Sequence, residues 1–186
     1  MKYNRNYLIE KMNGGEKLTF IPFWGHTSHL YRIGKTCLSQ WYDCLFEADG
    51  VLYHTTEQYM MAQKALLFHD MMTYSEIMAA DNPRDYKALG RKVQFFDSSV
   101  WDKEKYGIVL KGNLAKFGDN PELWDYLDGT GDSVLLEASP YDGIWGVKLG
   151  MEDPRIEDPN QWCGENLLGF ALMEVRDILR ERKEKS

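Results

Sequence analysis

The stretch "TTEQYMMAQKALLFHD", residues 55–70, predicts a helix that carries two charged side chains on an apolar face. Thr55 is followed three residues later by Gln58, the pattern of a capping box, so we expect the helix to begin there. Glu57 and Lys64 are seven residues apart. At 3.6 residues per turn they differ in direction by about 20° and lie roughly 10 Å apart along the helix axis.

The face shared by Glu57 and Lys64 also carries Met60, Met61 and Phe68, so the helix is predicted to be largely buried. Burying a charge without a partner is costly, and two interpretations remain open. One is a structural ion pair with other helices, or a lysine that extends to the surface. The other is a cleft where a carboxylate and an amine face a ligand. The first helical turn favours the ionised form of Glu57.

Composition and charge limit the class of protein. The chain has 186 residues, 44% hydrophobic and 27% charged, which fits a single domain over residues 1–186 with a core large enough to fold alone. The net charge of -7 argues against an extended basic surface for nucleic acid. The three cysteines form no CxxC pair, which favours a reduced, cytoplasmic protein. The histidines lack the spacing of a common zinc site, so we expect no metal.

The order of the expected elements predicts an α+β fold, mostly helical around a small β-sheet. Residues 17–24 predict a strand, and Asp49-Gly50 predicts the turn of a hairpin. Pro83 is expected to open the second of two short helices, and Ser98 or Ser99 to cap a longer one. The remaining elements are a helix in 120–131, a buried strand in 133–139 and an amphipathic helix in 164–185.

A second group of candidate residues follows the predicted strand at 133–139. The turn there carries Asp142 and Trp145, and the next loop supplies Trp162 and Asn166. Taken singly, each is consistent with a turn, cap or core residue. Together they resemble a site for a flat heterocycle, which proteins hold by aromatic stacking and by hydrogen bonds to its edge.

Several blocks of the sequence together resemble the NADAR family, also called the YbiA-like fold. They are "CLSQWYDCLFEADGVLYHTTEQYMMAQKALLFHD", "LGRKV", "KYGIVLKGNLAKF", "LLEASPYDGIWG" and "WCGENLLGFALMEVR", and they span about Phe20 to Arg176. The resemblance implies an α+β fold with helices around a small sheet, and an N-glycosidase that needs no cofactor. Some members hydrolyse ribosylamino-pyrimidine phosphates of the riboflavin pathway. Others remove ADP-ribose from guanine bases, including those of nucleic acid.

The resemblance also implies roles for particular residues. It implies catalytic roles for Glu57, Lys64 and Asp142. It implies substrate-binding roles for Trp24, His26, Ser39, Gln40, Trp41, Trp145, Trp162 and Asn166. Gln40 stands where other members have asparagine, which puts a hydrogen-bonding role there in doubt.

Two mechanisms fit these residues. In the first, Glu57 stabilises the positive charge that develops on the sugar, and Asp142 orients or deprotonates water. In the second, Lys64 attacks the sugar C1 as a nucleophile and forms a Schiff base. Burial would lower the pKa of Lys64 and Glu57 would raise it, and the sequence does not decide between these effects. The alternative functions are a non-catalytic module for ADP-ribose or NAD-derived nucleotides, and a structural protein. We expect no membrane partner, and the sequence leaves the oligomeric state open.

Overall fold

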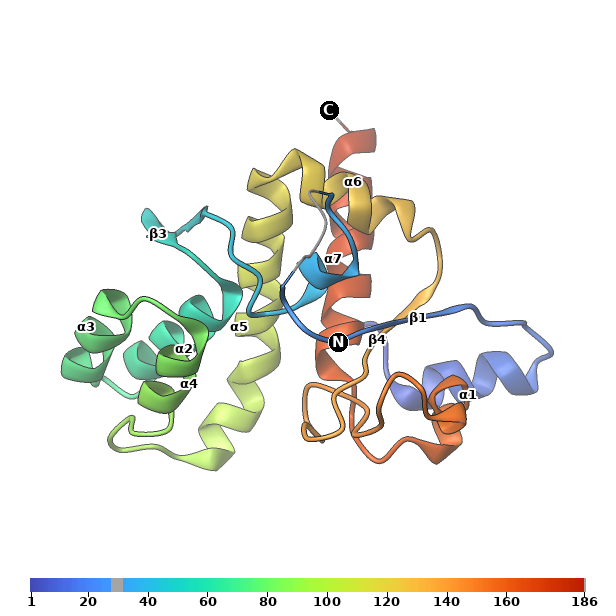
Figure 1. Cartoon of the computed structure of the whole chain (residues 1–186), viewed down its shortest axis with the longest axis horizontal. Helices are drawn as coiled ribbons and strands as arrows, with labels where there is room; N and C mark the ends of the chain where they lie inside the picture. Colours follow the sequence, from blue (N-terminus) through green and yellow to red (C-terminus); the bar gives the residue numbers. More distant parts are fainter. Residues whose placement is uncertain (28–31, 186) are drawn as a thin grey trace. The chain divides into compact units, whose positions relative to one another are not determined.

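The structure is a computed structural model that describes residues 1–27 and 32–185 (Figure 1). The chain forms two compact units: unit 1 comprises Met1–Ser39 with Pro121–Ser186, and unit 2 comprises Gln40–Asn120. The single domain expected over residues 1–186 stays a prediction. In the described part of the chain, no helix combines the length and the apolar content needed to cross a membrane.

Unit 2 begins with the predicted hairpin. Strand β2 (Phe46–Ala48) pairs antiparallel with β3 (Val51–Tyr53). Asp49 and Gly50 connect them with φ angles of 54° and 77°. Positive φ at both central residues is what a two-residue type I′ turn requires, so the hairpin prediction is confirmed.

Helix α2 (Thr56–Leu67) follows directly and carries the charged face predicted from the sequence. The Thr55 hydroxyl accepts a hydrogen bond of 3.0 Å from the Gln58 N–H, which confirms the predicted cap. The reciprocal bond of the predicted capping box, from the Thr55 N–H to the Gln58 side chain, is replaced by another. The Gln58 side chain instead accepts from the His54 N–H at 2.9 Å, so this part of the prediction is wrong. Both bonds fix the start of the helix.

Three further helices of unit 2 contact α2 or one another: α3 (Met71–Ala79), α4 (Pro83–Gly90) and α5 (Ser98–Asp119) (Figure 1). Pro83 opens α4 as predicted. The predicted cap of α5 at Ser98 or Ser99 is wrong, because the Asp97 carboxylate accepts from the Ser99 N–H at 2.8 Å. A carboxylate at this position also benefits from the helix dipole.

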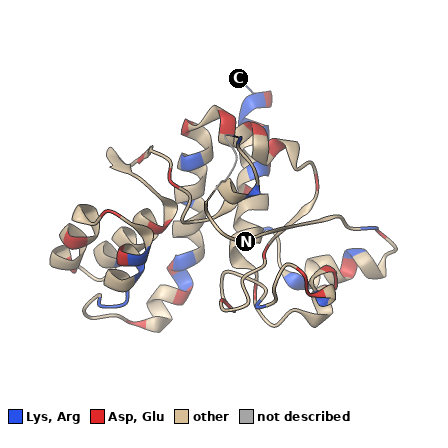
Figure 2. Cartoon of the chain, in the orientation of Figure 1, with Lys and Arg blue, Asp and Glu red and all other residues tan. Residues whose placement is uncertain are grey.

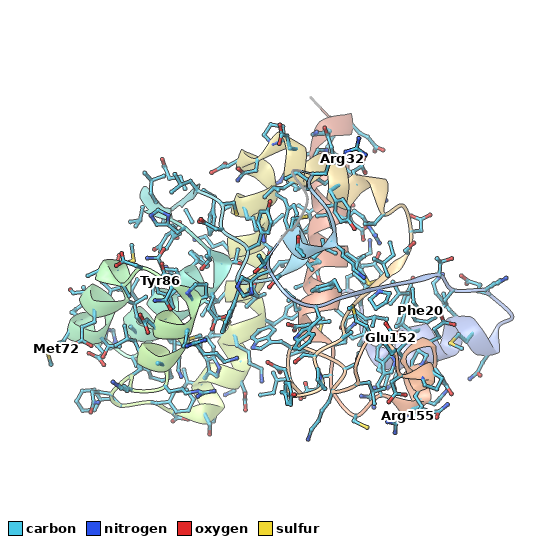
Figure 3. All side chains as sticks on the ribbon, viewed as in Figure 1. Phe20, Arg32, Met72, Tyr86, Glu152 and Arg155 are labelled. Atoms are coloured by element: carbon cyan, nitrogen blue, oxygen red, sulfur yellow. The ribbon has the colours of Figure 1, made fainter. Side chains whose placement is uncertain are left out.

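Side chains of unit 2 differ sharply in exposure, as Figure 3 illustrates. Tyr86 of α4 lies within the helices and is 1% exposed, whereas Met72 of α3 extends outward and is 74% exposed. The buried rings of Phe46, Tyr53 and Tyr59 pack together, with the Tyr53 and Tyr59 centroids 5.1 Å apart. This aromatic cluster joins the hairpin to α2.

Unit 1 contains a parallel strand pair, β1 (Phe20–Phe23) and β4 (Val134–Glu137), with Phe23 opposite Glu137. The predicted strand at 17–24 is correct in position but longer than the observed one. In the described residues the strands form two separate pairs and not one small sheet. The predicted class, mostly helical α+β, is confirmed.

The helices of unit 1 are α1 (Arg5–Asn13), α6 (Pro121–Gly129) and α7 (Leu167–Glu184). Three short 3-10 helices complete the unit: η1 (Lys35–Leu38) follows β1, and η2 (Pro154–Glu157) and η3 (Pro159–Gln161) lie between β4 and α7. Helix α7 packs against β4, and its last turn is basic, as predicted (Figure 2). Helix α1 was not predicted, because its sequence has only a weak apolar pattern.

Candidate functional site

The residues predicted for the site divide between the two units. Unit 2 holds Gln40, Trp41, Glu57 and Lys64. Unit 1 holds Trp24, His26, Ser39, Asp142, Trp145, Trp162 and Asn166. Each unit brings its own members onto neighbouring elements, so each group has a geometry of its own.

Glu57 lies in the first turn of α2 and is 4% exposed. Its N–H donates a hydrogen bond of 2.9 Å to the Gln40 carbonyl, which also accepts from the Thr56 hydroxyl at 3.2 Å. The Gln40 side chain is buried, and its Oε1 accepts from Asn113 Nδ2 of α5 at 2.9 Å. Gln40 therefore satisfies a backbone donor that the helix start leaves open, and it fixes the backbone at Glu57.

Lys64 lies two turns further along α2 and is partly buried. Its ammonium donates a hydrogen bond of 2.7 Å to the Gly90 carbonyl at the end of α4. Its Nζ lies 4.2 Å from the centroid of the Phe96 ring and 5.5 Å from that of Trp101. Burial lowers the pKa of Lys64 below its usual value of 10.5. Of the two opposed effects that the sequence left open, desolvation is the stronger.

Phe96 and Trp101 were not predicted to be site residues. Phe96 is 45% exposed, and its ring packs edge-on against Phe68 with the centroids 5.3 Å apart. Its neighbour Phe95 is 87% exposed and has a φ of 55°, which is unusual for a bulky side chain. The sequence feature that could have indicated a site here is the pair of adjacent aromatic residues in a loop just before a helix cap.

The carboxyl ends of β1 and β4 carry the second group. Because parallel strands end at the same edge of a sheet, Trp24 after β1 lies near the turn after β4. The rings of Trp24 and Tyr141 have centroids 6.4 Å apart, and the two residues are 47% and 83% exposed. This edge therefore offers aromatic surface to a ligand.

Asp142 organises the turn after β4. Its Oδ1 accepts hydrogen bonds from the Ile144 N–H at 2.9 Å and from the Trp145 N–H at 2.8 Å. Its own N–H donates to the Ser139 hydroxyl at 3.2 Å. Asp142 and Trp145 are both half-buried. The carboxylate is thus held in one orientation while it retains access to solvent.

Asn166 and Trp162 contact the protein itself through their polar atoms. Asn166 is fully buried with a φ of 58°, and its amide accepts from the Glu137 N–H and donates to the Leu135 carbonyl, both at 3.0 Å. Trp162 is 4% exposed and donates from Nε1 to the Ile156 carbonyl at 2.8 Å. Both side chains position the loop that precedes α7.

The other predicted residues lie at the edges of these groups. His26 is exposed and follows Trp24 by two residues, and half-buried Ser39 comes directly after η1. Trp41 is half-buried in unit 2, with the Lys87 ammonium 5.8 Å from its ring centroid. Across residues 1–27 and 32–185, no three metal-ligating side chains gather in one place. The absence of a metal and of a cofactor stays a prediction.

The NADAR domain matches residues 22–180 of this sequence. The chain belongs to the NADAR family. An N-glycosidase of Acanthamoeba polyphaga mimivirus is 40% identical over 157 residues, which are 82% of this chain and 92% of that protein. The N-glycosidase YbiA of Escherichia coli is 30% identical over 137 residues, 74% of this chain and 77% of YbiA.

The fold agrees with this assignment. The solution structure of Escherichia coli YbiA superposes with a TM-score of 0.74 at 26% identity, covering 92% of this chain and 90% of YbiA. A riboflavin biosynthesis protein of Vibrio vulnificus is 28% identical over 144 residues, 77% of this chain and 35% of that protein. This NADAR chain is an enzyme of the N-glycosidase class. The NADAR match covers both groups of site residues and leaves α1 outside.

Proposed function

We propose that this NADAR protein hydrolyses the C1–N bond between a ribose and an amino-substituted pyrimidine or purine. One observation carries the proposal: a lysine whose pKa is lowered by burial shares helix α2 with a buried glutamate. A carboxylate fixed in a buried position can stabilise a developing positive charge. An amine of lowered pKa is neutral, and therefore nucleophilic, at a lower pH than an ordinary lysine.

In the electrostatic route, the C1–N bond breaks and its electron pair leaves on the nitrogen, which takes up a proton. The ring oxygen shares the positive charge that develops at C1, and the Glu57 carboxylate stabilises it. Water then bonds to C1 and gives its proton to Asp142, the carboxylate held by the turn after β4. The products are the free sugar and the amino heterocycle.

In the covalent route, the sugar ring opens to an iminium and the neutral Lys64 amine adds to C1. The heterocyclic amine leaves with a proton, a Schiff base to Nζ forms, and water hydrolyses it. Burial lowers the pKa of Lys64 and so favours the neutral amine that this route needs. Borohydride added during turnover should leave a reduced sugar adduct on Lys64. Active enzyme without that adduct would exclude this route.

A ribosylamino-pyrimidine phosphate is the substrate that we place first. The Vibrio relative is named a riboflavin biosynthesis protein, and the net charge of -7 favours a free nucleotide over duplex nucleic acid. In the described residues no cysteine forms a disulfide, which supports a cytoplasmic location. The other substrate to be tested is ADP-ribosylated guanosine, free or in a single strand.

Incubation of the purified protein with each substrate tests the proposal. Release of the pyrimidine from the first substrate supports the proposal. Release of guanine products from the second substrate alone would instead assign the protein to the ADP-ribosyl-guanine branch. The variant Lys64→Met serves as the control for contaminating activity. Binding of either compound without release would favour the non-catalytic module instead.

A further inference from the structure

Helix α1 lies outside the NADAR match, yet it contacts the loop that precedes α7. Arg5, at the first position of α1, donates a hydrogen bond from Nη2 to the Gly164 carbonyl. The helix also packs against η3, the 3-10 turn just before that loop (Figure 1). A guanidinium bound to a carbonyl makes a charge-assisted bond, which is stronger than a neutral one.

The loop that carries Gly164 is bonded along its length to the turn that holds Asp142. Backbone N–H groups of the first segment donate to carbonyls of the second at 3.0 to 3.2 Å. The pairs are Cys163 to Val147, Glu165 to Gly143, Asn166 to Gly146, Leu167 to Ile144 and Leu168 to Trp145. The position of the Asp142–Trp145 turn therefore depends on residues 163–168.

Gly164 leaves no space between these two segments. A Cβ at this position would lie 2.2 Å from the Gly146 carbonyl oxygen and 3.0 Å from the Gly143 Cα. The backbones are thus in direct contact, and tightly packed protein transmits a displacement instead of absorbing it. A shift of the Gly164 carbonyl would consequently move the turn.

The start of the chain is also fixed to α7. The Tyr3 hydroxyl and the Lys2 ammonium both bind the Asp177 carboxylate, at 2.5 and 2.6 Å. Burial and the hydrogen bond to Asp177 raise the pKa of Tyr3 to about 12, so the hydroxyl keeps its proton at neutral pH. Leu8 of α1 is 1% exposed. These contacts are separate from the one that Arg5 makes with the Gly164 carbonyl.

We propose that α1 is a positioning element for the Asp142–Trp145 turn and that Arg5 is the positioning residue through which it acts. Arg5 acts through the Gly164 carbonyl and the backbone bonds of residues 163–168. The effect on catalysis rests on the proposed function of Asp142, whereas the effect on the turn does not.

Hydrogen exchange tests the mechanical part without a substrate. Arg5→Ala should speed exchange of the amides of residues 165–168 by about tenfold, because their loop loses its outer anchor. Lys2→Ala is the matched control, since it removes a cation that binds α7 and leaves the Gly164 contact intact. Unchanged exchange in Arg5→Ala, or equal acceleration in Lys2→Ala, would overturn the proposal.

Kinetics test the catalytic part. Arg5→Ala should lower kcat about tenfold and leave KM within about twofold, because the turn positions a catalytic carboxylate. Arg5→Lys, which can still donate to the carbonyl, should recover kcat to within about threefold of wild type. A lower melting temperature with unchanged kcat would reduce Arg5 to a structural role. If wild-type protein cleaves neither substrate while exchange behaves as expected, the proposed function fails and the positioning role stands.

Discussion

Replacing Gly112 with alanine should destabilise the protein, although alanine is normally the better residue inside a helix. Gly112 is buried in the middle of α5, where α5 packs against α2. A Cβ there would lie 2.5 Å from Cδ1 and 3.0 Å from Cε1 of the Tyr59 ring. Carbon atoms normally approach to roughly 3.5 Å, so the ring must move by about 1 Å.

The ring has little freedom to move. Tyr59 is 1% exposed and packs edge-on against Tyr53 and also against Phe46. Overpacking of this kind costs about 1–3 kcal/mol, and the gain from replacing a helical glycine offsets about 0.5–1 kcal/mol of it. We expect Gly112→Ala to lower the free energy of unfolding by about 1–2 kcal/mol.

Gly107 provides a matched control on the same helix. A Cβ at Gly107 would meet no atom within 4 Å, so Gly107→Ala should stabilise the protein by about 0.5–1 kcal/mol. The pair is compared by urea denaturation, with kcat measured in parallel. Because Tyr59 is two residues from Glu57, Gly112→Ala should also lower kcat, by up to about 100-fold for a displacement near 1 Å. Equal stability of the two variants would refute the packing argument.

Three further predictions concern single side chains. Because the pKa of Lys64 is lowered, a reaction that needs the neutral amine should speed up with rising pH and level off below pH 10.5, whereas Lys64→Arg should stay inactive throughout the pH–rate profile. Asn166→Ala should cost about 3 kcal/mol or more in thermal unfolding, because it leaves the Glu137 N–H and the Leu135 carbonyl unpaired, and a loss below about 1 kcal/mol would contradict this. The bond to Arg155 holds the pKa of Asp153 at about 2 against an ordinary 3.8. The ionised Asp153 therefore stabilises the folded protein above pH 3.8, and this contribution is lost as the pH falls to about 2. Acid unfolding of Asp153→Asn should lack the loss of stability in this pH range.

Local sequence signals predicted much of unit 2. The Asp49-Gly50 turn, the Thr55 cap and the Pro83 start all follow from the conformational needs of a few neighbouring residues, and all three are observed. The cap at Asp97 was missed because Ser98 and Ser99 are also good caps, and only the backbone geometry chooses between them.

Contacts between distant residues could not be predicted in this way. The pattern of α2 indicated that Glu57 and Lys64 face one way, but not that Phe96 lies over Lys64, because 32 positions of chain separate the two. Likewise the family resemblance implied a ligand-binding role for Asn166, and only the contact of β4 with the loop before α7 reveals its backbone partners. The parallel pairing of β1 with β4 spans more than 100 residues and leaves no local signal.

We propose that Glu57 and Lys64 of α2 carry out the cleavage and do not merely hold the fold. Single-turnover cleavage of the ribosylamino-pyrimidine phosphate, with binding measured separately, tests it directly. Glu57→Gln should lower the cleavage rate more than about tenfold and Lys64→Met should abolish it, while Kd stays within about threefold of wild type. A folded Lys64→Met variant that cleaves at the wild-type rate would contradict the account.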